Sequence, residues 1–358
     1  MKICFVVGAR PNFMKAFPVI NEFKKKKIKS FLLHTGQHYD DKMSQIFFDQ
    51  IGVSDADFKL DVKASSQTSQ TAYIMVEIEK VFSEIIPDWI FVFGDINSTL
   101  AASLVASKMN IRIAHVESGL RSFDLSMPEE INRMIVDRIS DLLFVTEKSG
   151  MDNLKNDGIS DYKIKFIGNT MIDSLIKMNS KIEDSNVVDK FELQRYQYCV
   201  LTLHRPSNVD FVEQINIILN NIKKWSNNMV VLWPKHPRID LSILNNDLKN
   251  IRIVDPLGYF EFIKLVKNSF CVFTDSGGIQ EETSYLGVKC FTIRENTERP
   301  STIINGTNTL ISSKNYDKNF NWIKEQVRKS PKKTNIQLWD GKASKRICEE
   351  FFKFINNN

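Results

Sequence analysis

The sequence predicts an α/β protein built from two doubly wound parallel-sheet domains. Short apolar runs alternate with amphipathic segments of helical length along nearly the whole chain. Apolar runs without polar alternation are typical of parallel strands whose two faces are both covered by helices. The chain has 358 residues, more than one hydrophobic core usually holds, and the alternation restarts after residue 170. These observations indicate two domains of the same type.

The first domain is expected over residues 1–168. Each of its apolar runs is followed by a turn or by a segment long enough for a helix, as in repeated βαβ units. The predicted strands are residues 3–7, 31–33, 89–93, 111–116 and 142–145.

The second domain is expected over residues 169–342, after a hinge near residues 167–172. Its predicted strands are residues 199–203, 229–233, 270–274 and 290–293. The amphipathic pattern of residues 343–354 predicts a last helix, and we expect the segment 343–358 to pack back on the first domain.

Composition excludes several classes of protein. A formal net charge of +5 is small for this length and argues against a nucleic-acid partner. No apolar run is long enough to span a bilayer, and the first apolar run is too short for a signal peptide. Five cysteines without a CxxC spacing fit a reducing compartment and core packing. We therefore expect a cytoplasmic protein.

The segment Thr274–Glu282 predicts a phosphate-binding turn. It joins an apolar run directly to a helix-like segment, and Ser276 can cap that helix. Gly277 and Gly278 let an anion approach bare backbone N–H groups at the positive end of the helix dipole. One turn later, Glu282 can accept hydrogen bonds from a ribose diol, which favours a nucleotide as ligand. The alternative is a capped surface helix with a glycine turn.

Polar residues follow the other predicted strands, where ligands of doubly wound sheets bind. Asp95 and Glu117 each follow an apolar run, and Glu129 begins a helix behind Pro128. Acids that converge beside a nucleotide site favour proton transfer, although Glu129 and Glu130 can equally serve the helix start. The histidines at these ends are contact candidates or structural residues: His34, His38, His115, His204 and His236.

The turn after the first strand, Gly8–Lys15, has no GxGxxG pattern, so a dinucleotide is not expected. Arg10 and Lys15 in this turn can face a diphosphate or be ordinary surface cations. The chain has no cluster of cysteines with histidines, so neither a metal nor any other cofactor is expected.

Taken together, these motifs resemble the non-hydrolysing UDP-N-acetylglucosamine 2-epimerase family along nearly the whole chain. Many ordered motifs are more specific than any one of them. The matching segments are Gly8–Pro11, His34–His38, Gly94–Asp95, His115–Arg121, Pro128–Arg133, Gly168–Thr170, His204–Arg205, Asp275–Glu282 and Thr297–Pro300.

The resemblance implies two Rossmann-like domains facing a cleft, which is a GT-B-like architecture. It also implies a homodimeric enzyme that needs no cofactor and supplies precursors of surface polysaccharides. It implies elimination of UDP to 2-acetamidoglucal and re-addition after the C2 proton returns on the other face. The catalytic residues it implies are Asp95, Glu117, Glu129 and His204. The substrate-binding residues it implies are Arg10, Lys15, Arg205, His236, Ser276, Gly277, Gly278 and Glu282, with Glu282 on the ribose and His236 near the uridine and phosphates.

Some positions depart from the family pattern. Pro206 and Ser207 follow His204–Arg205 in place of the more familiar residues, and residues 62–68 lack the arginine expected of an activating second UDP-sugar site. Asp40 also departs from the family pattern for that activating site, so allosteric activation is not expected. Related substrates such as UDP-2,3-diacetamido-glucuronate stay open, as do a GT-B glycosyltransferase and a non-catalytic UDP-sugar sensor.

Overall fold

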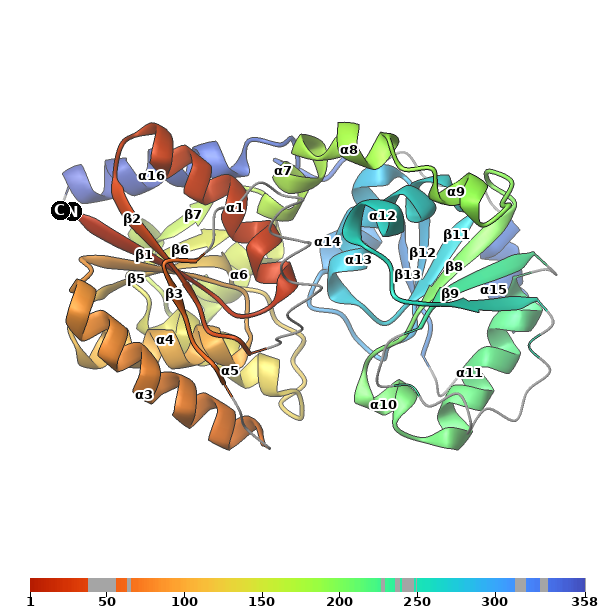
Figure 1. The fold of residues 1–358 in the computed structure, drawn as a ribbon, viewed down its shortest axis with the longest axis horizontal. Coiled ribbons are helices and arrows are strands. Elements are labelled where there is room, and N and C mark those ends of the chain that lie inside the picture. The colour runs from red at the N-terminus through yellow and green to blue at the C-terminus, as the bar shows by residue number, and fades with distance from the viewer. Residues whose placement is uncertain are drawn as a thin grey trace. The chain divides into compact units, whose positions relative to one another are not determined.

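The computed structural model describes residues 1–37, 56–62, 66–226, 229–235, 239, 248, 250–312, 320–328 and 334–357 (Figure 1). The chain divides into two compact units. Unit 1 comprises Met1–Lys177 and Gln337–Asn358, and unit 2 comprises Met178–Ile336. Within the described part of the chain, no helix combines the length and the apolar character needed to cross a membrane.

The described strands of unit 1 form a seven-stranded parallel sheet of order β3-β2-β1-β4-β5-β6-β7. Chain order reverses between β1 and β4, which makes their carboxyl ends the place where such sheets bind ligands. The strands are β1 (Lys2–Val7), β2 (Lys29–His34), β3 (Phe58–Lys59), β4 (Trp89–Phe93), β5 (Arg112–Ser118), β6 (Leu142–Val145) and β7 (Ile164–Phe166). The short strands β3 and β7 were not among the predicted ones.

Helices cover both faces of this sheet (Figure 1). On one face, Phe5 and Phe91 meet Phe23 of α1 and Phe351 of α16, with ring centroids 5.6 Å apart for Phe5–Phe23 and 5.2 Å for Phe91–Phe351. The alternate strand residues pack on α3 and α4. The helices are α1 (Arg10–Lys25), α3 (Gln67–Ile85), α4 (Asn97–Lys108), α5 (Pro128–Ile139), α6 (Lys148–Asn156), the 3₁₀ turn η1 (Asp161–Lys163), α7 (Thr170–Lys177) and α16 (Ala343–Asn356).

The observed division of the chain differs from the expected boundary after residue 168. Helix α7 belongs to unit 1, because the Asp173 carboxylate accepts hydrogen bonds from Ala343 N at 3.1 Å and Ser344 N at 2.7 Å at the start of α16. The residues just before α16 also belong to unit 1, where the Trp339 indole donates to Thr146 O at 3.1 Å. A boundary read from the restart of the strand pattern could not detect these contacts.

The described strands of unit 2 form a six-stranded parallel sheet of order β10-β9-β8-β11-β12-β13, with the reversal between β8 and β11. Its strands are β8 (Tyr198–Thr202), β9 (Val230–Pro234), β10 (Ile251–Val254), β11 (Cys271–Thr274), β12 (Lys289–Thr292) and β13 (Asn308–Leu310). Strands β10 and β13 were not predicted. The expected fold class, two doubly wound parallel-sheet domains, is confirmed.

The apolar strands of unit 2 also have two buried faces. Cys199 and Leu201 of β8 pack in one core cluster, whereas Tyr198 and Val200 pack in the other. The helices of unit 2 are α8 (Asn179–Glu183), α9 (Val187–Lys190), α10 (Pro206–Val209), α11 (Val212–Trp225), α12 (Tyr259–Asn268), α13 (Gly277–Leu286), α14 (Pro300–Ile304) and α15 (Phe320–Arg328).

Candidate functional site

The carboxyl ends of β1 and β4 are joined by Asn12 in unit 1. Its side-chain oxygen accepts a hydrogen bond from Ala9 N at 3.1 Å, and its amide donates to Phe93 O at 2.8 Å. The first turn of α1 is thereby fixed beside the end of β4. Arg10 begins this helix and is half-buried.

Glu117 is turned toward this edge by an irregularity in β5. The register of β5 against β6 shifts between Val116 and Ser118, and Glu117 itself has φ of 72°. A bulge re-aims a side chain, and this left-handed conformation costs a non-glycine residue about 1–3 kcal/mol. The buried Glu117 carboxylate forms an ion pair with the Lys15 ammonium.

Gly94 lies directly against this ion pair. A methyl carbon at Gly94 would lie 3.4 Å from Lys15 Nζ and 3.5 Å from Glu117 Oε2, and Gly94 has φ of 64°. A residue with a side chain would therefore be strained by this left-handed backbone, and its methyl carbon would contact both charged groups. The structure thus brings together Lys15 and Glu117, which the sequence assigned to phosphate binding and catalysis respectively.

Asp95 follows Gly94 and is held by two residues of α5. Arg133 forms an ion pair with the Asp95 carboxylate, and its Nε donates to Asp95 Oδ2 at 3.2 Å. Asn132 donates to the Asp95 carbonyl oxygen at 2.9 Å. The Asp95 side chain keeps 26% exposure, so the fixed carboxylate still reaches the surface of unit 1.

The two acids at the start of α5 differ in role. Glu130 is buried and accepts hydrogen bonds from Ser122 N at 2.9 Å and Phe123 N at 3.0 Å, so it fixes the preceding loop. Glu129 is half-buried, and its carboxylate makes no hydrogen bond or ion pair with any residue that the structure describes. Both acids lie in the first turn of α5, where the sequence left open a role at the helix start, but of the two only Glu130 also holds the preceding loop within the described residues.

His115 and His34 are enclosed in unit 1. His115 Nδ1 lies 2.8 Å from Asp137 Oδ1, and its Nε2 lies 2.8 Å from the Gly94 carbonyl oxygen. Both ring nitrogens are thus engaged within the protein, which makes His115 a structural residue. Burial, followed by the positive charge of Lys59, lowers the pKa of His34 to about 4, so this histidine stays neutral near neutral pH.

In unit 2, Asp275 organises the ends of β8 and β11. It is fully buried, and its carboxylate accepts hydrogen bonds from Arg205 N at 2.9 Å and Asn208 Nδ2 at 3.1 Å. His204 Nδ1 lies 2.7 Å from Asp275 Oδ1, whereas the His204 side chain keeps 43% exposure. Arg205 Nε also donates to the Asp275 carbonyl oxygen at 3.1 Å.

The glycine turn lies at the amino end of α13. Ser276 occupies the N-cap position with extended backbone, but within residues 274–287 its side chain accepts no capping hydrogen bond, so the predicted side-chain cap is wrong. The Thr274 hydroxyl instead accepts a hydrogen bond from Ser276 N at 3.0 Å. The Ser276 hydroxyl therefore does not cover the backbone N–H groups in the first turn of α13.

The two glycines of this turn serve different needs. A methyl carbon at Gly277 would lie 2.5 Å from Arg299 Nη1 and 2.7 Å from Glu298 Oε1, so a side chain there would displace the buried Arg299–Glu298 ion pair. At Gly278, no described atom lies within 4 Å of the same position. Only the second glycine therefore presents bare backbone to an open side of α13.

The two glutamates of α13 also have different partners. Glu281 is buried in an ion pair with Arg299, with Nε 2.8 Å from Glu281 Oε1. Glu282 is buried too, and accepts a hydrogen bond from the Tyr259 hydroxyl at 2.8 Å. Gln280 secures the helix start, accepting from Thr297 Oγ1 at 2.7 Å. Glu281 thus has a structural partner in the neighbouring loop.

Several sequence candidates lie outside the described residues. These are His236, His38 and Asp40, together with residues 63–65 of the segment compared with an activating site. Among the residues that the structure does describe, no group of three or more histidine, cysteine, aspartate or glutamate side chains is arranged to hold a metal ion.

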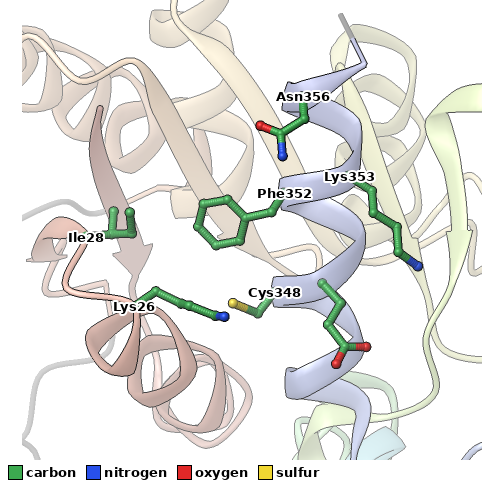
Figure 2. A pocket seen from close by; sticks show the side chains of 7 residues that line it. Lys26, Ile28, Cys348, Phe352, Lys353 and Asn356 are labelled. Carbon is green, nitrogen blue, oxygen red and sulfur yellow. The ribbon is translucent and has the colours of Figure 1, made fainter.

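A hollow of about 460 Å³ lies elsewhere in unit 1, between α16 and the end of α1 (Figure 2). Lys26 and Ile28 lie in the turn between α1 and β2, so the hollow lies at the amino ends of the strands and not at the edge that carries the acids. It is lined by Lys26, Ile28, Cys348, Glu349, Phe352, Lys353 and Asn356.

Three residues with a direct role at these edges were not among the predicted site residues. Arg133 positions Asp95, Asn12 joins β1 to β4, and Asp275 contacts His204. Asp275 offered a signal, because it directly follows a buried strand just as Asp95 follows Gly94. For Arg133 and Asn12, only the pairing of distant segments reveals the role.

Comparison with known proteins gives a consistent result. Residues 21–351 match the family described as UDP-N-acetylglucosamine 2-epimerase. A UDP-N-acetylglucosamine 2-epimerase of Methanococcus maripaludis is 42% identical over 366 residues, which cover 98% of each chain. A UDP-2,3-diacetamido-2,3-dideoxy-D-glucuronate 2-epimerase of Pseudomonas aeruginosa is 37% identical over 99% of this chain and 100% of its own.

Solved structures agree with these matches. The UDP-N-acetylglucosamine 2-epimerase of Methanocaldococcus jannaschii, solved in complex with UDP-N-acetylglucosamine and UDP, is 37% identical with a TM-score of 0.91 over 99% of this chain and 100% of its own. A calicheamicin glycosyltransferase, 10% identical with a TM-score of 0.54 over 99% of this chain and 98% of its own, shares the fold alone. This likeness supports the expected GT-B-like architecture.

Proposed function

The chain belongs to the UDP-N-acetylglucosamine 2-epimerase family, and from this premise we propose that it interconverts UDP-N-acetylglucosamine and UDP-N-acetylmannosamine. The family resemblance drawn from the motifs is confirmed by the match over residues 21–351. The observation that carries the proposal is the placement of Glu117, which a strained bulge turns onto Lys15 and Gly94 at the ligand-binding edge of unit 1.

The proposed reaction begins with removal of the C2 proton as UDP leaves C1, which gives 2-acetamidoglucal. The proton then returns to the other face of C2, and UDP adds again to C1. The C2 hydrogen is only weakly acidic, so its removal needs a positioned carboxylate and a stabilised leaving group. We assign the carboxylate chemistry to Asp95, Glu117 and Glu129, and a further catalytic contact to His204.

These acids have different surroundings, which suits different roles. Glu117 is paired with Lys15 and Asp95 with Arg133, whereas Glu129 has no such partner among the described residues. A diphosphate that attracts Lys15 would loosen the Lys15–Glu117 pair as the substrate arrives. This would couple phosphate binding to the availability of the Glu117 carboxylate.

We assign the nucleotide to unit 2. The open backbone at Gly278 and the N-terminus of α13 supply N–H donors and a favourable dipole for phosphate. Glu282 lies one turn into the same helix, where it can exchange its Tyr259 contact for a ribose diol. The remaining residues in this assignment are Ser276, Gly277, Arg205 and His236, with Arg10 and Lys15 as the cations of unit 1.

The test is incubation of the protein with UDP-N-acetylglucosamine alone, followed by proton NMR. We expect the manno epimer to form, and in deuterium oxide we expect solvent deuterium at C2 of the product. Amide variants Asp95→Asn, Glu117→Gln and Glu129→Gln should each lose at least ~10²-fold in kcat, the usual contribution of a general acid or base. Glu84→Gln, an exposed position on α3, is the matched control and should keep full activity.

Product that retains protium at C2 would refute the elimination route. Full activity in any one amide variant would remove that residue from the chemistry. A glycosyltransferase of the same fold would show no turnover until a sugar acceptor is supplied, so acceptor-independent epimerisation separates the two functions.

A second substrate deserves the same assay because of the Pseudomonas aeruginosa relative, which is named for UDP-2,3-diacetamido-2,3-dideoxy-D-glucuronate. A C2 epimerase of that sugar would use the same carboxylates and nucleotide turn. We expect the ratio of kcat/KM for the two sugars to identify the substrate, and a ratio that favours the diacetamido sugar would replace the first proposal.

The proposal includes a homodimer that uses the exposed side of α5. Ile131, Met134 and Ile135 recur at helical spacing there and are all exposed, and Phe123 in the preceding loop is 80% exposed. Large exposed apolar patches often mark association surfaces. Sedimentation should show a dimer, and Met134→Lys should shift it toward monomer; an unshifted dimer would place the interface elsewhere.

The proposal also assigns the reaction to the cytoplasm, in the supply of surface-polysaccharide precursors. All five cysteines are buried and unpaired by disulfides, which suits a reducing compartment. Deletion of the gene should lower the cellular pool of the manno epimer and the polysaccharide built from it, and an unchanged pool would contradict this assignment.

A further inference from the structure

In unit 2, the partners of the Asp275 carboxylate decide which atom donates in its contact with His204. Besides His204 Nδ1, the Asp275 carboxylate faces three N–H groups: His204 N at 3.1 Å, Arg205 N at 2.9 Å and Asn208 Nδ2 at 3.1 Å. All of these can only donate. Burial alone would raise the pKa of Asp275, but the hydrogen bonds from His204, Arg205 and Asn208 outweigh it and lower that pKa.

An ionised carboxylate accepts hydrogen bonds and cannot donate them. The contact at 2.7 Å between Asp275 Oδ1 and His204 Nδ1 therefore requires the proton to lie on Nδ1. In the neutral ring, the lone pair then belongs to Nε2, on the edge of the ring that points away from Asp275. Because the His204 side chain keeps 43% exposure, this edge is the one that can meet a ligand.

We propose that Asp275 is a positioning residue that holds His204 in the tautomer with Nδ1 protonated and Nε2 directed to the substrate. This inference rests on the proposed role of His204 in the epimerase reaction. A carboxylate behind an imidazole fixes both the ring orientation and the tautomer, and it stabilises the imidazolium when Nε2 gains a proton. The charged groups at this position include Asp275, which directly follows β11, and Arg205, from the same loop as His204.

Asp275 also binds the backbone N–H groups of His204 and Arg205, so a purely structural role must be separated from positioning. Asp275→Asn keeps the size of the side chain and one accepting oxygen. If that oxygen stays on the backbone N–H groups, the new amide N–H faces His204 Nδ1. Nδ1 must then accept, and the proton moves to Nε2.

The direct test is NMR of the intact protein labelled with ¹⁵N-histidine. The chain has five histidines, and loss of one signal in His204→Gln assigns His204. We expect protonation at Nδ1 in the parent protein and at Nε2 in Asp275→Asn. Asn208→Ala removes another hydrogen bond to Asp275 without touching His204, and as the matched control it should keep the parent tautomer. A parent protein with the neutral proton on Nε2 would overturn the proposal.

Activity provides the second arm. Asp275→Asn should lower kcat by roughly 10²–10⁴-fold, the range for loss of a correctly oriented acid or base, while the Kd for UDP changes by less than about threefold. In a His204→Gln background, the same substitution should add little further loss, because residues that act through one another are not additive. An additive loss, or weakened UDP binding in proportion to lost activity, would show a structural role instead.

The two arms separate this inference from the proposed function. The tautomer measurement needs no turnover, so a switched tautomer in a protein that epimerises neither UDP-sugar would defeat the function and leave the positioning intact. Active protein whose tautomer does not respond to Asp275→Asn would defeat the positioning alone. If Asp275→Asn does not fold, the parent tautomer and Asn208→Ala still decide the question.

Discussion

The molecule contains two histidine–aspartate pairs, one in each unit, with nearly equal contact distances and different surroundings. His115 Nδ1 lies 2.8 Å from Asp137 Oδ1 in unit 1, and His204 Nδ1 lies 2.7 Å from Asp275 Oδ1 in unit 2. The His115 ring is fully buried with Nε2 on the Gly94 carbonyl oxygen, whereas the His204 side chain keeps 43% exposure. The same pair of residue types therefore supports structure in one unit and faces outward in the other.

The position of each histidine along its strand explains this difference. His115 lies inside β5, between neighbouring strands and under α5, so protein atoms meet both ring nitrogens. His204 lies beyond the last residue of β8, at the carboxyl end where the sheet is open to ligands. A histidine–aspartate contact by itself therefore does not identify a catalytic residue, because the same contact occurs at a fully buried histidine and at a partly exposed one.

The largest expected effect is on activity at the open pair. His204→Gln should lower kcat by roughly 10²–10⁴-fold, because a positioned proton-transfer or charge-stabilising group is lost. The melting temperature should stay close to that of the parent, since the side chain is partly exposed. Steady-state kinetics with calorimetry checks both. A variant with normal kcat would show that His204 takes no part in the reaction, and the two histidine–aspartate pairs would then not differ in function.

At the enclosed pair the effect should fall on stability. Asp137→Ala leaves His115, Gly119 N–H and Arg121 without the carboxylate that they contact, at 2.8, 3.1 and 2.6 Å. Removing one partner of a buried charged network costs about 3–5 kcal/mol of unfolding free energy. The matched control is Asp157→Ala, at the more exposed partner of Arg121, which should cost at most about 1 kcal/mol. Equal losses in urea unfolding would contradict the contrast.

His34 provides a third, enclosed histidine and a pH test. Its pKa is lowered from 6.5 to about 4, first by burial and then by Lys59. The unfolded chain therefore binds a proton between these values that the folded protein does not. The resulting stabilisation is complete above pH 6.5 and is lost as pH falls toward 4, by about 3 kcal/mol in all.

Urea unfolding between pH 4 and pH 7 checks this expectation. His34→Gln should flatten the pH dependence in that window relative to the parent protein, whatever its effect on stability at pH 7. A variant that keeps the parent slope would assign the acid sensitivity to other groups.

The smallest expected effect is in nucleotide binding by unit 2. Glu282→Ala should raise the Kd for UDP by about 10–100-fold, the usual loss for a hydrogen bond to a charged group. Glu117→Ala should change it much less, because we assign Glu117 to the sugar ring. Tyr259→Phe removes only the hydroxyl that contacts Glu282 and should have a smaller effect than Glu282→Ala. Equal effects of the two glutamate variants in calorimetry would remove this division of roles.

The sequence anticipated the strands with uninterrupted apolar runs. It missed β3, β7 and β13, which have two or three residues, and β10, whose apolar run is interrupted by Arg252. Phe58–Lys59 and Asn308–Leu310 are too brief to show a period, and they are strands because a neighbouring strand pairs with them. The division after Lys177 differs from the expected boundary after residue 168 for a similar reason. Contacts of Asp173 with the start of α16 join segments that the local pattern cannot connect.

At the candidate site, the sequence by itself determined the residue types and their places after the strands. Asp95, Glu117, His204 and the Gly277–Gly278 turn follow from apolar runs that end in polar residues, and the ordered motifs determined the family. Local pattern can do this because strand ends and helix starts are local features.

Only the tertiary structure decided which of these groups meet. Asp275 is 71 positions from His204, Arg133 is 38 positions from Asp95, and Lys15 comes from a different element than Glu117. The bulge that turns Glu117 and the burial that makes Glu130 and Glu281 structural also depend on neighbouring strands and loops. Such pairings arise from how strands order in the sheet and how deeply each end is covered, and no periodicity along the chain records them.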